Sequence, residues 1–258
     1  MTLRPAASLD RILPDMTGLR ALVTGAGSGI GLATAALFAR AGAAVAANHL
    51  PADAAGADRI AALDGAVTPA PGDMGAPESV AAMVAAAAGH LGGFDILVNN
   101  AGTPGTPVPI AYDDLDAMTE ARWQTILSVN LIGPFRCVHA ARPHLAPGAA
   151  VVNTASIAGL GGKASSLAYG ASKAGLVNLT RNLAAALGPG VRVNAVAPGL
   201  TETGWIADWP EERKRLSLEA TDLRRMVTPE DVAMAIAFLA LHPAITGQVL
   251  PVDCGRHY

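Results

Sequence analysis

The sequence predicts an α/β fold, a doubly wound and predominantly parallel sheet with helices on both faces. Short apolar runs, each bounded by Gly, Pro or Asn, are typical of strands that are buried on both faces. Longer Ala-rich stretches lie between these runs, and unbroken strand–helix alternation favours parallel strands. Because 51% of the 258 residues are hydrophobic and 15% are charged, the chain can bury a large core.

Seven apolar runs are the predicted strands, over residues 21–24, 44–48, 67–70, 96–99, 149–154, 191–196 and 247–252. The predicted helices span residues 30–41, 54–63, 78–90, 121–145, 167–187 and 229–241. The last helix has a clear start, because Thr228 is a good N-cap, Pro229 suits the first helical position, and two acids follow. No linker interrupts the pattern, so we expect one domain over residues 1–258, with an irregular leader at 1–18.

Composition argues against several classes of protein. A net charge of −3 and a pI near 6.0 give no sign of a nucleic-acid or membrane partner. The N-terminus does not read as a secretory signal, and the apolar stretch 80–98 is too interrupted to span a membrane, so a cytoplasmic location is expected. Cys137 and Cys254 lie far apart and are expected to be buried free thiols. No metal site is expected, because the six histidines lack ligand spacing.

A glycine-rich turn follows the first predicted strand and opens the first helix. It reads Thr24-Gly25-Ala26-Gly27-Ser28-Gly29-Ile30-Gly31, which fits the pattern T-G-x-x-x-G-x-G. Glycines let a backbone approach a pyrophosphate, and a helix N-terminus offers free N–H groups and a positive dipole end. The alternative is a tight turn without a ligand. The predicted phosphate-binding residues are Gly25, Ser28, Gly29, Ile30 and Gly31.

With this turn, the chain resembles the compact form of the short-chain dehydrogenase/reductase family from about Gly18 to its end. Three further motifs match in order: an Asp after the third strand, N-N-A-G after the fourth, and a P-G turn. The resemblance implies a Rossmann-type seven-stranded sheet that binds NAD or NADP. It assigns cofactor contacts to Asp73, Met74, Asn100, Ala101, Gly102, Pro198, Gly199, Thr201 and Thr203. The backbone near Thr201 and the hydroxyl of Thr203 would hold the nicotinamide carboxamide.

The cofactor form depends on the tip of the second strand. A carboxylate there normally binds the ribose 2′-OH of NAD and repels the phosphate of NADP. The tip has none, because Asp53 comes several residues late, and Ser28 stands where the family's NADP-binding members carry a basic residue. Asn48, His49 and Ser28 would hydrogen-bond a phosphate, so NADP(H) is favoured over NAD(H). The alternative for His49 is an ordinary surface-loop histidine.

Tyr169 and Lys173 lie four residues apart, so they share one face of the predicted helix 167–187. Ser156 lies 13 residues before Tyr169, just past a strand, and the set matches the family's catalytic Ser, Tyr and Lys. Tyr169 and Lys173 also count among the cofactor contacts, since in the family the Lys holds the nicotinamide ribose. A three-residue gap between Tyr and Lys is typical of the ketone- and alcohol-acting members.

These residue types suit proton transfer to an alkoxide that hydride transfer creates. A phenol has an ordinary pKa of about 10, and an ammonium ~6 Å away favours the phenolate by roughly 2.8 kcal/mol at an effective dielectric of ~20. We therefore expect Lys173 to lower the pKa of Tyr169, which acts as acid in reduction and base in oxidation. Ser156 would stabilise charge on the substrate oxygen.

Asn130 matches the family's fourth catalytic position, where a main-chain carbonyl holds a water that relays protons toward the Lys. Pro134 lies four residues downstream and has no N–H, so the Asn130 carbonyl would lose its usual helical partner. The alternative is that Pro134 merely kinks the helix.

The polar segment 204–225 lies where the family places a mobile substrate lid. We expect residues 103–108, 157–162 and 205–209 to line the pocket, with room left by Gly159, Gly161 and Gly162. The lid's tryptophans either cover a substrate or pack on the core. The family also implies a homo-oligomer, a tetramer or dimer, assembled through residues 121–145, 167–187 and 247–258.

The predicted function is NAD(P)-dependent hydride transfer between nicotinamide C4 and the carbon of a carbonyl or secondary alcohol, as in short-chain alcohol dehydrogenases and ketoreductases. The substrate is a small molecule that the sequence does not specify. Two rivals remain: a nucleotide-sugar epimerase or dehydratase, and a non-catalytic dinucleotide-binding regulator. The turn spacing argues against the first and the retained Ser-Tyr-Lys set against the second.

Overall fold

A single parallel sheet organises residues 13–256, the part of the chain that the computed structural model describes. Its strand order is β3-β2-β1-β4-β5-β6-β7, and every neighbouring pair is parallel. The strands are β1 (Arg20–Val23), β2 (Ala44–His49), β3 (Val67–Pro71), β4 (Phe94–Asn99), β5 (Leu145–Thr154), β6 (Arg192–Pro198) and β7 (Val249–Val252). All seven predicted strands are present, so the doubly wound parallel prediction is confirmed.

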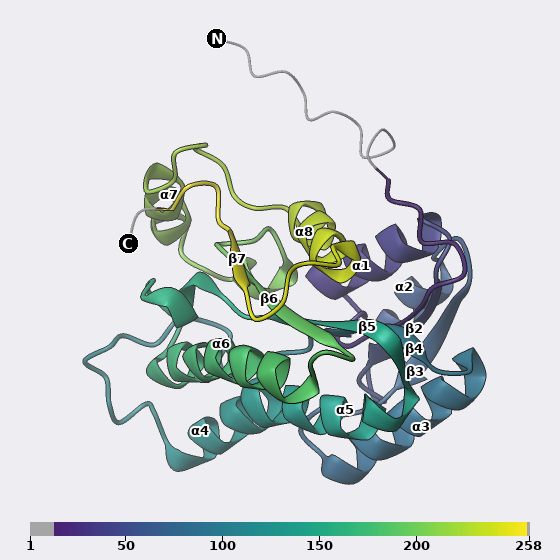
Figure 1. The fold of residues 1–258 in the computed structure, drawn as a ribbon. Coiled ribbons are helices and arrows are strands. Elements are labelled where there is room, and N and C mark those ends of the chain that lie inside the picture. Colours follow the sequence, from purple (N-terminus) through teal and green to yellow (C-terminus); the bar gives the residue numbers. More distant parts are fainter. Residues whose placement is uncertain (1–12, 257–258) are drawn as a thin grey trace.

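Helices cover both faces of the sheet (Figure 1). One face carries α1 (Gly29–Arg40), α2 (Ala54–Ala61) and α8 (Pro229–Leu241), and its core includes Phe38, Ile60 and Ile236. The other carries α3 (Pro77–Leu91), α5 (Gly133–Ala141) and α6 (Leu167–Leu187), with Met83, Cys137 and Leu183 in its core. Burial of apolar side chains on both sheet faces explains why the strands are continuous apolar runs.

The long helix predicted over residues 121–145 is wrong as a single element. The chain forms α4 (Glu120–Leu127), a π-helical turn η2 (Ser128–Ile132), α5 and a short 3₁₀ turn η3 (Arg142–His144), and β5 already begins at Leu145. Pro134 is the second residue of α5, so it cannot donate to the carbonyl four residues back. The π-helical turn lies directly before it, where the ordinary helical ladder is interrupted.

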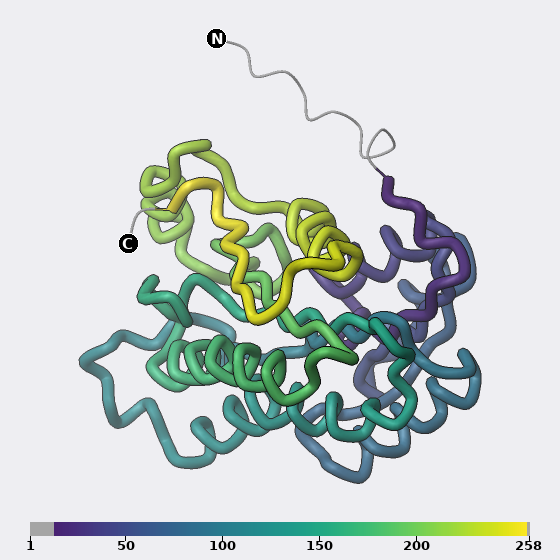
Figure 2. Tube along the Cα trace, viewed as in Figure 1, coloured from purple at the N-terminus to yellow at the C-terminus, as the bar shows by residue number. Residues whose placement is uncertain are grey.

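Three segments far apart in sequence gather at the carboxyl edge of the strands. Figure 2 shows the excursion between β4 and α4 on the same side of the view as the N-terminus of α6 and α7 (Glu211–Glu219). Hydrogen bonds join them: Ile110 N–H donates to Ser165 O, Ala164 N–H donates to the Tyr112 hydroxyl, and Arg213 of α7 donates to Ala164 O. The strand order reverses between β1 and β4, and clefts form outside the strand ends at such a point.

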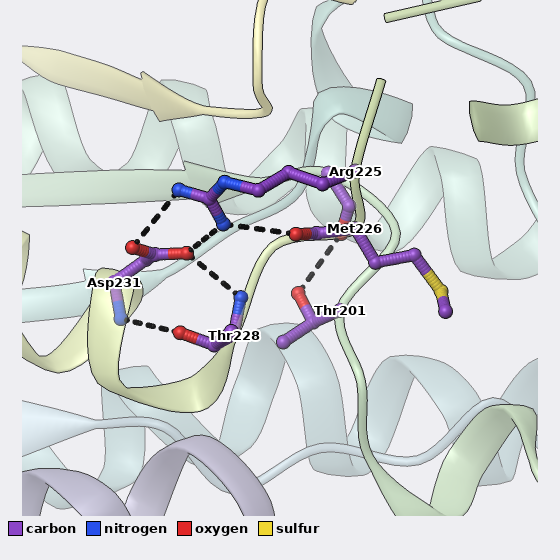
Figure 3. Close-up of polar contacts among 6 residues, drawn as sticks. Thr201, Arg225, Met226, Thr228 and Asp231 are labelled. Atoms are coloured by element: carbon purple, nitrogen blue, oxygen red, sulfur yellow. Dashed lines mark hydrogen bonds and ion pairs between the residues drawn. The ribbon is translucent and has the colours of Figure 1, made fainter. Parts of the chain in front are cut away.

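The predicted lid, residues 204–225, contains a 3₁₀ turn η5 (Gly204–Ile206) and α7, and both of its ends are anchored. At its base, Glu202 N–H donates to Val227 O and Val227 N–H donates to Leu200 O. Figure 3 shows how the chain then enters α8: Arg225 pairs with Asp231 at 2.5 Å, and Asp231 also accepts from the backbone N–H of Thr228. The lid therefore leaves and rejoins the sheet edge at one fixed point.

Other predictions fall partly outside the described residues. Residues 1–12 of the predicted leader and residues 257–258 lie there, whereas Met16 is fully buried and donates its N–H to Ala41 O. Both cysteines are free thiols, but Cys254 is only partly buried. Within residues 13–256, no helix is both long and apolar enough to cross a bilayer.

Candidate active site

A cleft of about 1170 Å³ runs along the carboxyl edge of the sheet. The glycine-rich turn, Ser156 after β5, Tyr169 and Lys173 of α6, and residues of the lid all line it. This volume is generous for a small-molecule site, and it suits a dinucleotide together with a substrate.

The glycine-rich turn makes a cradle that only glycine permits. Gly25 has φ +64°, and a Cβ there would lie 2.7 Å from the Ala101 Cα. A Cβ on Gly31 would lie 2.1 Å from the Gly25 carbonyl oxygen, so Gly31 packs α1 against the turn and does not itself line the cleft. The Ser28 side chain makes no cap hydrogen bond, and the first turn of α1 has no acid. An exposed positive helix end therefore faces the cleft, as a pyrophosphate requires.

The segment after β4 holds this cradle in place. The Thr24 hydroxyl accepts the backbone N–H groups of Asn100 (2.9 Å) and Ala101 (3.0 Å). The Asn100 amide donates to the carbonyls of Thr24 (3.1 Å) and Gly25 (3.2 Å). The Asn100 side-chain amide therefore hydrogen-bonds to the glycine-rich turn and stabilises the cradle.

On the adenine side, Asp73 and Met74 both line the cleft, and Asp73 accepts a 2.8 Å bond from Gly75 N–H. Asn48 does not present a free amide there, which corrects the expectation that it would bind a phosphate. Its side chain accepts from Gly25 N–H at 3.0 Å and donates to two carbonyls at 3.0 Å each, those of Ala70 and Gly72. The physical reason is that a buried amide must satisfy its own donors and acceptor first.

Two charged residues of the α2 region approach Gly27, and sequence reasoning missed their position. Asp53 lines the cleft, and one of its carboxylate oxygens lies 2.9 Å from where a Gly27 Cβ would be. Arg59 donates to the Gly27 carbonyl at 2.6 Å and lies 3.9 Å from the Asp53 carboxylate. Asp53 is the N-cap of α2 and accepts the Gly56 N–H at 2.8 Å, and this start of the helix lies against the glycine-rich turn.

The nicotinamide side is built from the segment after β6. Pro198, Gly199, Thr201 and Thr203 all line the cleft. Gly199 packs tightly on the C-terminal segment, where a Cβ would lie 2.9 Å from the Asp253 Cα. Thr203 reaches across to the glycine-rich turn, with its methyl carbon 3.1 Å from a Cβ placed on Gly29. The two cofactor loops therefore meet over the cleft.

The structure brings Ser156, Tyr169 and Lys173 together. The Lys173 ammonium lies 5.7 Å from the centroid of the Tyr169 ring and donates a 2.7 Å hydrogen bond to Thr154 O. The Ser156 side chain lies close enough to Tyr169 to lower the pKa of its phenol. Ser156 is the N-cap of the short 3₁₀ turn η4 (Ile157–Leu160), and Ser166 is the N-cap of α6. These caps fix the start of the turn that follows Ser156 and the start of the helix that carries Tyr169 and Lys173. Each of the three residues lines the cleft.

The expectation that Lys173 lowers the pKa of Tyr169 does not hold for the protein alone. Burial raises the pKa of Tyr169 to about 12, and the Ser156 hydrogen bond offsets only part of this. Burial also lowers the pKa of Lys173 to about 8. The ammonium has therefore lost its proton before the phenol would ionise, so it gives no charge stabilisation at the pH where Tyr169 titrates.

Asn130 lies in the π-helical turn and is fully buried behind the cleft. Its side chain accepts from Thr103 N–H at 2.8 Å, donates to Thr103 O at 2.9 Å, and donates to Ser172 at 3.2 Å. The side chain thus braces the loop after β4 against the catalytic helix. The predicted water-binding role of its carbonyl stays a proposal.

Aromatic lid residues cover the reacting end. The Trp205 ring meets the Tyr169 ring edge-on with centroids 6.3 Å apart, and it keeps 43% of its surface exposed, so it does not pack into the core. It also lies 3.4 Å from a Cβ placed on Gly102.

The lining was only partly predicted. Residues 103–104, 157–158, 205–206 and 209 line the cleft, and residues 110–112 and 163–165 replace the rest of the predicted stretches. Gly159 leaves no room for a substrate, because a Cβ there would lie 2.6 Å from the Lys173 backbone. It lets η4 lie directly on the catalytic helix.

Comparisons with known proteins and solved structures identify the family of this chain. A family profile described as Enoyl-(Acyl carrier protein) reductase matches residues 25–257. The chain is 42% identical over 244 residues to cis-4-hydroxycyclohexanecarboxylate dehydrogenase of Sinomonas cyclohexanicum, covering 91% of this chain and 95% of that one. It is 37% identical over 242 residues to meso-2,3-butanediol dehydrogenase of Serratia marcescens, covering 91% and 92%.

Among solved structures, a short-chain dehydrogenase from Burkholderia cenocepacia J2315 in complex with NADP superposes with a TM-score of 0.83 and 33% identity, covering 93% of this chain and 98% of that one. The glycine cradle, the Ser-Tyr-Lys cluster and these similarities over nearly the full length lead to one conclusion. The chain belongs to the short-chain dehydrogenase/reductase family.

Proposed function

We propose that this NAD(P)-dependent oxidoreductase transfers hydride between nicotinamide C4 and the carbon of a ketone or secondary alcohol, with Tyr169 as the proton donor and acceptor. The gathering of Ser156, Tyr169 and Lys173 in one cleft carries the proposal. When bound, the nicotinamide supplies or accepts the hydride. The named activities of the two dehydrogenase relatives support a secondary alcohol as the substrate class.

Each protein group has a distinct part in the reaction. Because burial raises the pKa of Tyr169 to about 12, its phenol is protonated at neutral pH and ready to donate to a carbonyl oxygen. Ser156 donates a hydrogen bond to the same oxygen and stabilises the charge that develops on it. Lys173 is protonated below its pKa of about 8, so near pH 7 its positive charge stabilises the negative charge that develops on the phenol.

Replacing Tyr169 with Phe tests the assignment. It removes only the hydroxyl, so we expect turnover of alcohols and ketones to fall by at least about 100-fold while nucleotide affinity stays within a few-fold. Nucleotide binding is measured by fluorescence of the reduced nicotinamide, and turnover by its absorbance. A variant that keeps wild-type turnover would refute the role of Tyr169, and normal binding without turnover in the wild type would favour a non-catalytic binder.

For the cofactor form we propose a preference for NADP(H). Ser28 has a side chain free of cap bonds, and Arg59 places a guanidinium beside Gly27, where sequence reasoning had found no basic residue. The Asp53 carboxylate also faces Gly27 and opposes a phosphate, but Arg59 partly offsets its charge at 3.9 Å. The preference for NADP(H) therefore depends on whether the attraction of the phosphate to Arg59 exceeds its repulsion by Asp53.

Kinetics with both nucleotides test the preference. Arg59→Met is expected to lower kcat/KM for NADPH by about tenfold and leave NADH within a few-fold, because an exposed phosphate contact of about 1–2 kcal/mol is lost. Asp53→Asn is expected to raise kcat/KM for NADPH relative to NADH. A wild-type preference for NADH would overturn the proposal.

We also propose that the protein is a homo-oligomer, a dimer or tetramer. Ile132 and Phe135, in the region predicted to form the interface, keep 43% and 47% of their surface exposed. Light scattering coupled to size exclusion gives the mass directly, and a monomer at micromolar concentration would refute this. The cytoplasmic location stays a prediction.

A further inference from the structure

The lid end of the cleft carries more positive than negative charge. Lys163, Arg213 and Arg256 line this end. Among the described residues, Glu212 is the one carboxylate that lines it, and Arg215 neutralises Glu212 through two hydrogen bonds of 2.6 and 2.9 Å. A ligand in this part of the cleft therefore meets a net positive field.

Arg213 is the cation in the most defined position. Its guanidinium lies 4.9 Å from the Trp209 ring centroid and donates one 3.3 Å hydrogen bond to Ala164 O. Among the described residues Arg213 forms no salt bridge, and partial burial lowers the pKa of its guanidinium while the nearby Tyr112 raises it. A guanidinium has five N–H donors and this one has a single hydrogen bond to the described protein, so its other donors are open to an acceptor on a ligand in the cleft.

A second polar group nearby also has no partner. The Ser165 side chain lines the cleft and is buried, and no described group hydrogen-bonds its hydroxyl. It follows Ala164, whose backbone is held on one side by Arg213 and on the other by the Tyr112 hydroxyl at 2.6 Å. Buried polar groups are nearly always satisfied, so an unpartnered hydroxyl in the cleft lining, next in sequence to the residue that Arg213 contacts, indicates that a ligand supplies the missing partner.

This cluster is close to the reaction centre. Ala164 packs directly on Gly170, with its Cβ 3.2 Å from the position that a Gly170 Cβ would take, and Gly170 follows Tyr169. Arg213 and Tyr169 line the same cleft, so one small molecule in it would carry both the anion and the reacting carbon. Segments from the β4–α4 excursion, the start of α6 and the lid all contribute, so the arrangement exists only when the lid is in place.

We propose that Arg213, with Ser165, binds a carboxylate at the end of the substrate remote from the reacting carbon, so that the substrate is a small oxo- or hydroxy-carboxylate. This inference rests on the proposed hydride transfer for the identity of the reacting carbon. The carboxylate supplies acceptors for the unused donors of Arg213 and for the Ser165 hydroxyl, and charge-assisted bonds of this kind are the stronger ones.

Binding of ligands that cannot react tests the anion site independently of hydride transfer. Cyclohexanecarboxylate and cyclohexanecarboxamide are titrated into the full-length protein with saturating nucleotide, with tryptophan fluorescence as the signal, since Arg213 stacks on Trp209. We expect the carboxylate to bind at least about tenfold tighter than the amide, the difference to vanish in Arg213→Gln, and Arg213→Lys to retain part of it. Arg181→Gln, an exposed change on α6, is the control for net charge and should behave as wild type.

Turnover of 4-oxocyclohexanecarboxylate and its carboxamide completes the test. Equal binding of acid and amide by the wild type, or a preference that survives in Arg213→Gln, would overturn the anion site even if both ketones are reduced. A carboxylate preference in binding with no reduction of either ketone would leave the anion site standing and contradict the proposed reaction. Retained nucleotide binding in Arg213→Gln shows that this variant is folded. If Arg213→Gln does not fold, the comparison of carboxylate and amide binding is made with Arg213→Lys.

Discussion

Lys173→Met should slow alcohol oxidation by an amount that depends on pH. The Lys173 ammonium lies 5.7 Å from the Tyr169 ring centroid, which at an effective dielectric of ~20 corresponds to about 2.9 kcal/mol of stabilisation for a phenolate. At 1.36 kcal/mol for each factor of ten, removal of this charge costs about 100-fold in the rate of proton abstraction. Because the pKa of Lys173 is about 8, the charge is present below that pH and absent well above it.

The assay is kcat for oxidation of a secondary alcohol at saturating nucleotide, from about pH 6 to pH 10. The ratio of wild type to Lys173→Met is expected to be about 100 near pH 6.5 and to shrink as the pH rises through about 8. Lys173→Arg keeps its charge over the whole range, so its ratio to Lys173→Met should not shrink. A wild-type ratio that is constant across the range would refute the electrostatic role and leave Lys173 with a positioning role only.

Four further variants test the fold and its supports. Gly31→Ala places a Cβ 2.1 Å from the Gly25 carbonyl oxygen and should abolish nucleotide binding, whereas Gly89→Ala, with no atom within 4 Å, should stabilise the protein by about 0.5–1 kcal/mol in urea unfolding. Asp231→Ala removes the capping box of α8 and should lower Tm by about 2 °C or more, from a loss of about 1 kcal/mol; an unchanged Tm would contradict this. The hydrogen bond from Arg20 lowers the pKa of Asp95, so its contribution to stability is present above about pH 4 and lost on acidification. Asp95→Asn should therefore be less stable than wild type at pH 7 in urea, with the difference closing near pH 3.

The helices α6 and α8 begin and end where the sequence predicts them, and local chemistry is the reason. The Thr228–Asp231 capping box is formed, with bonds of 2.9 and 3.2 Å, by residues three apart in the chain. The Tyr169–Lys173 pairing likewise needs only helical geometry. The glycine pattern predicts a cradle because only glycine takes positive φ without strain, and Gly25 and Gly29 do so.

Other features depend on contacts between distant segments. The start of β5 at Leu145 is set by pairing with Phe94, which no local pattern announces. From the sequence, Asn48 is expected to lie exposed at the tip of a strand. In the structure its side-chain amide hydrogen-bonds to the glycine-rich turn and to the carbonyls at the end of β3. Gly159 looks like free space for a substrate, but it is the contact between η4 and α6.

The sequence by itself determined the fold class, the glycine-rich turn and the pairing of Tyr169 with Lys173, because each is encoded in residues a few positions apart or in a strand–helix alternation. Only the tertiary structure decided the electrostatics and the specificity. Desolvation of Tyr169 and Lys173 depends on what the folded chain packs around them, and it reverses the expected direction for the phenol. The meeting of Tyr112, Ala164 and Arg213 joins three segments about 50 residues apart, so it exists only once the sheet has brought their ends to one edge.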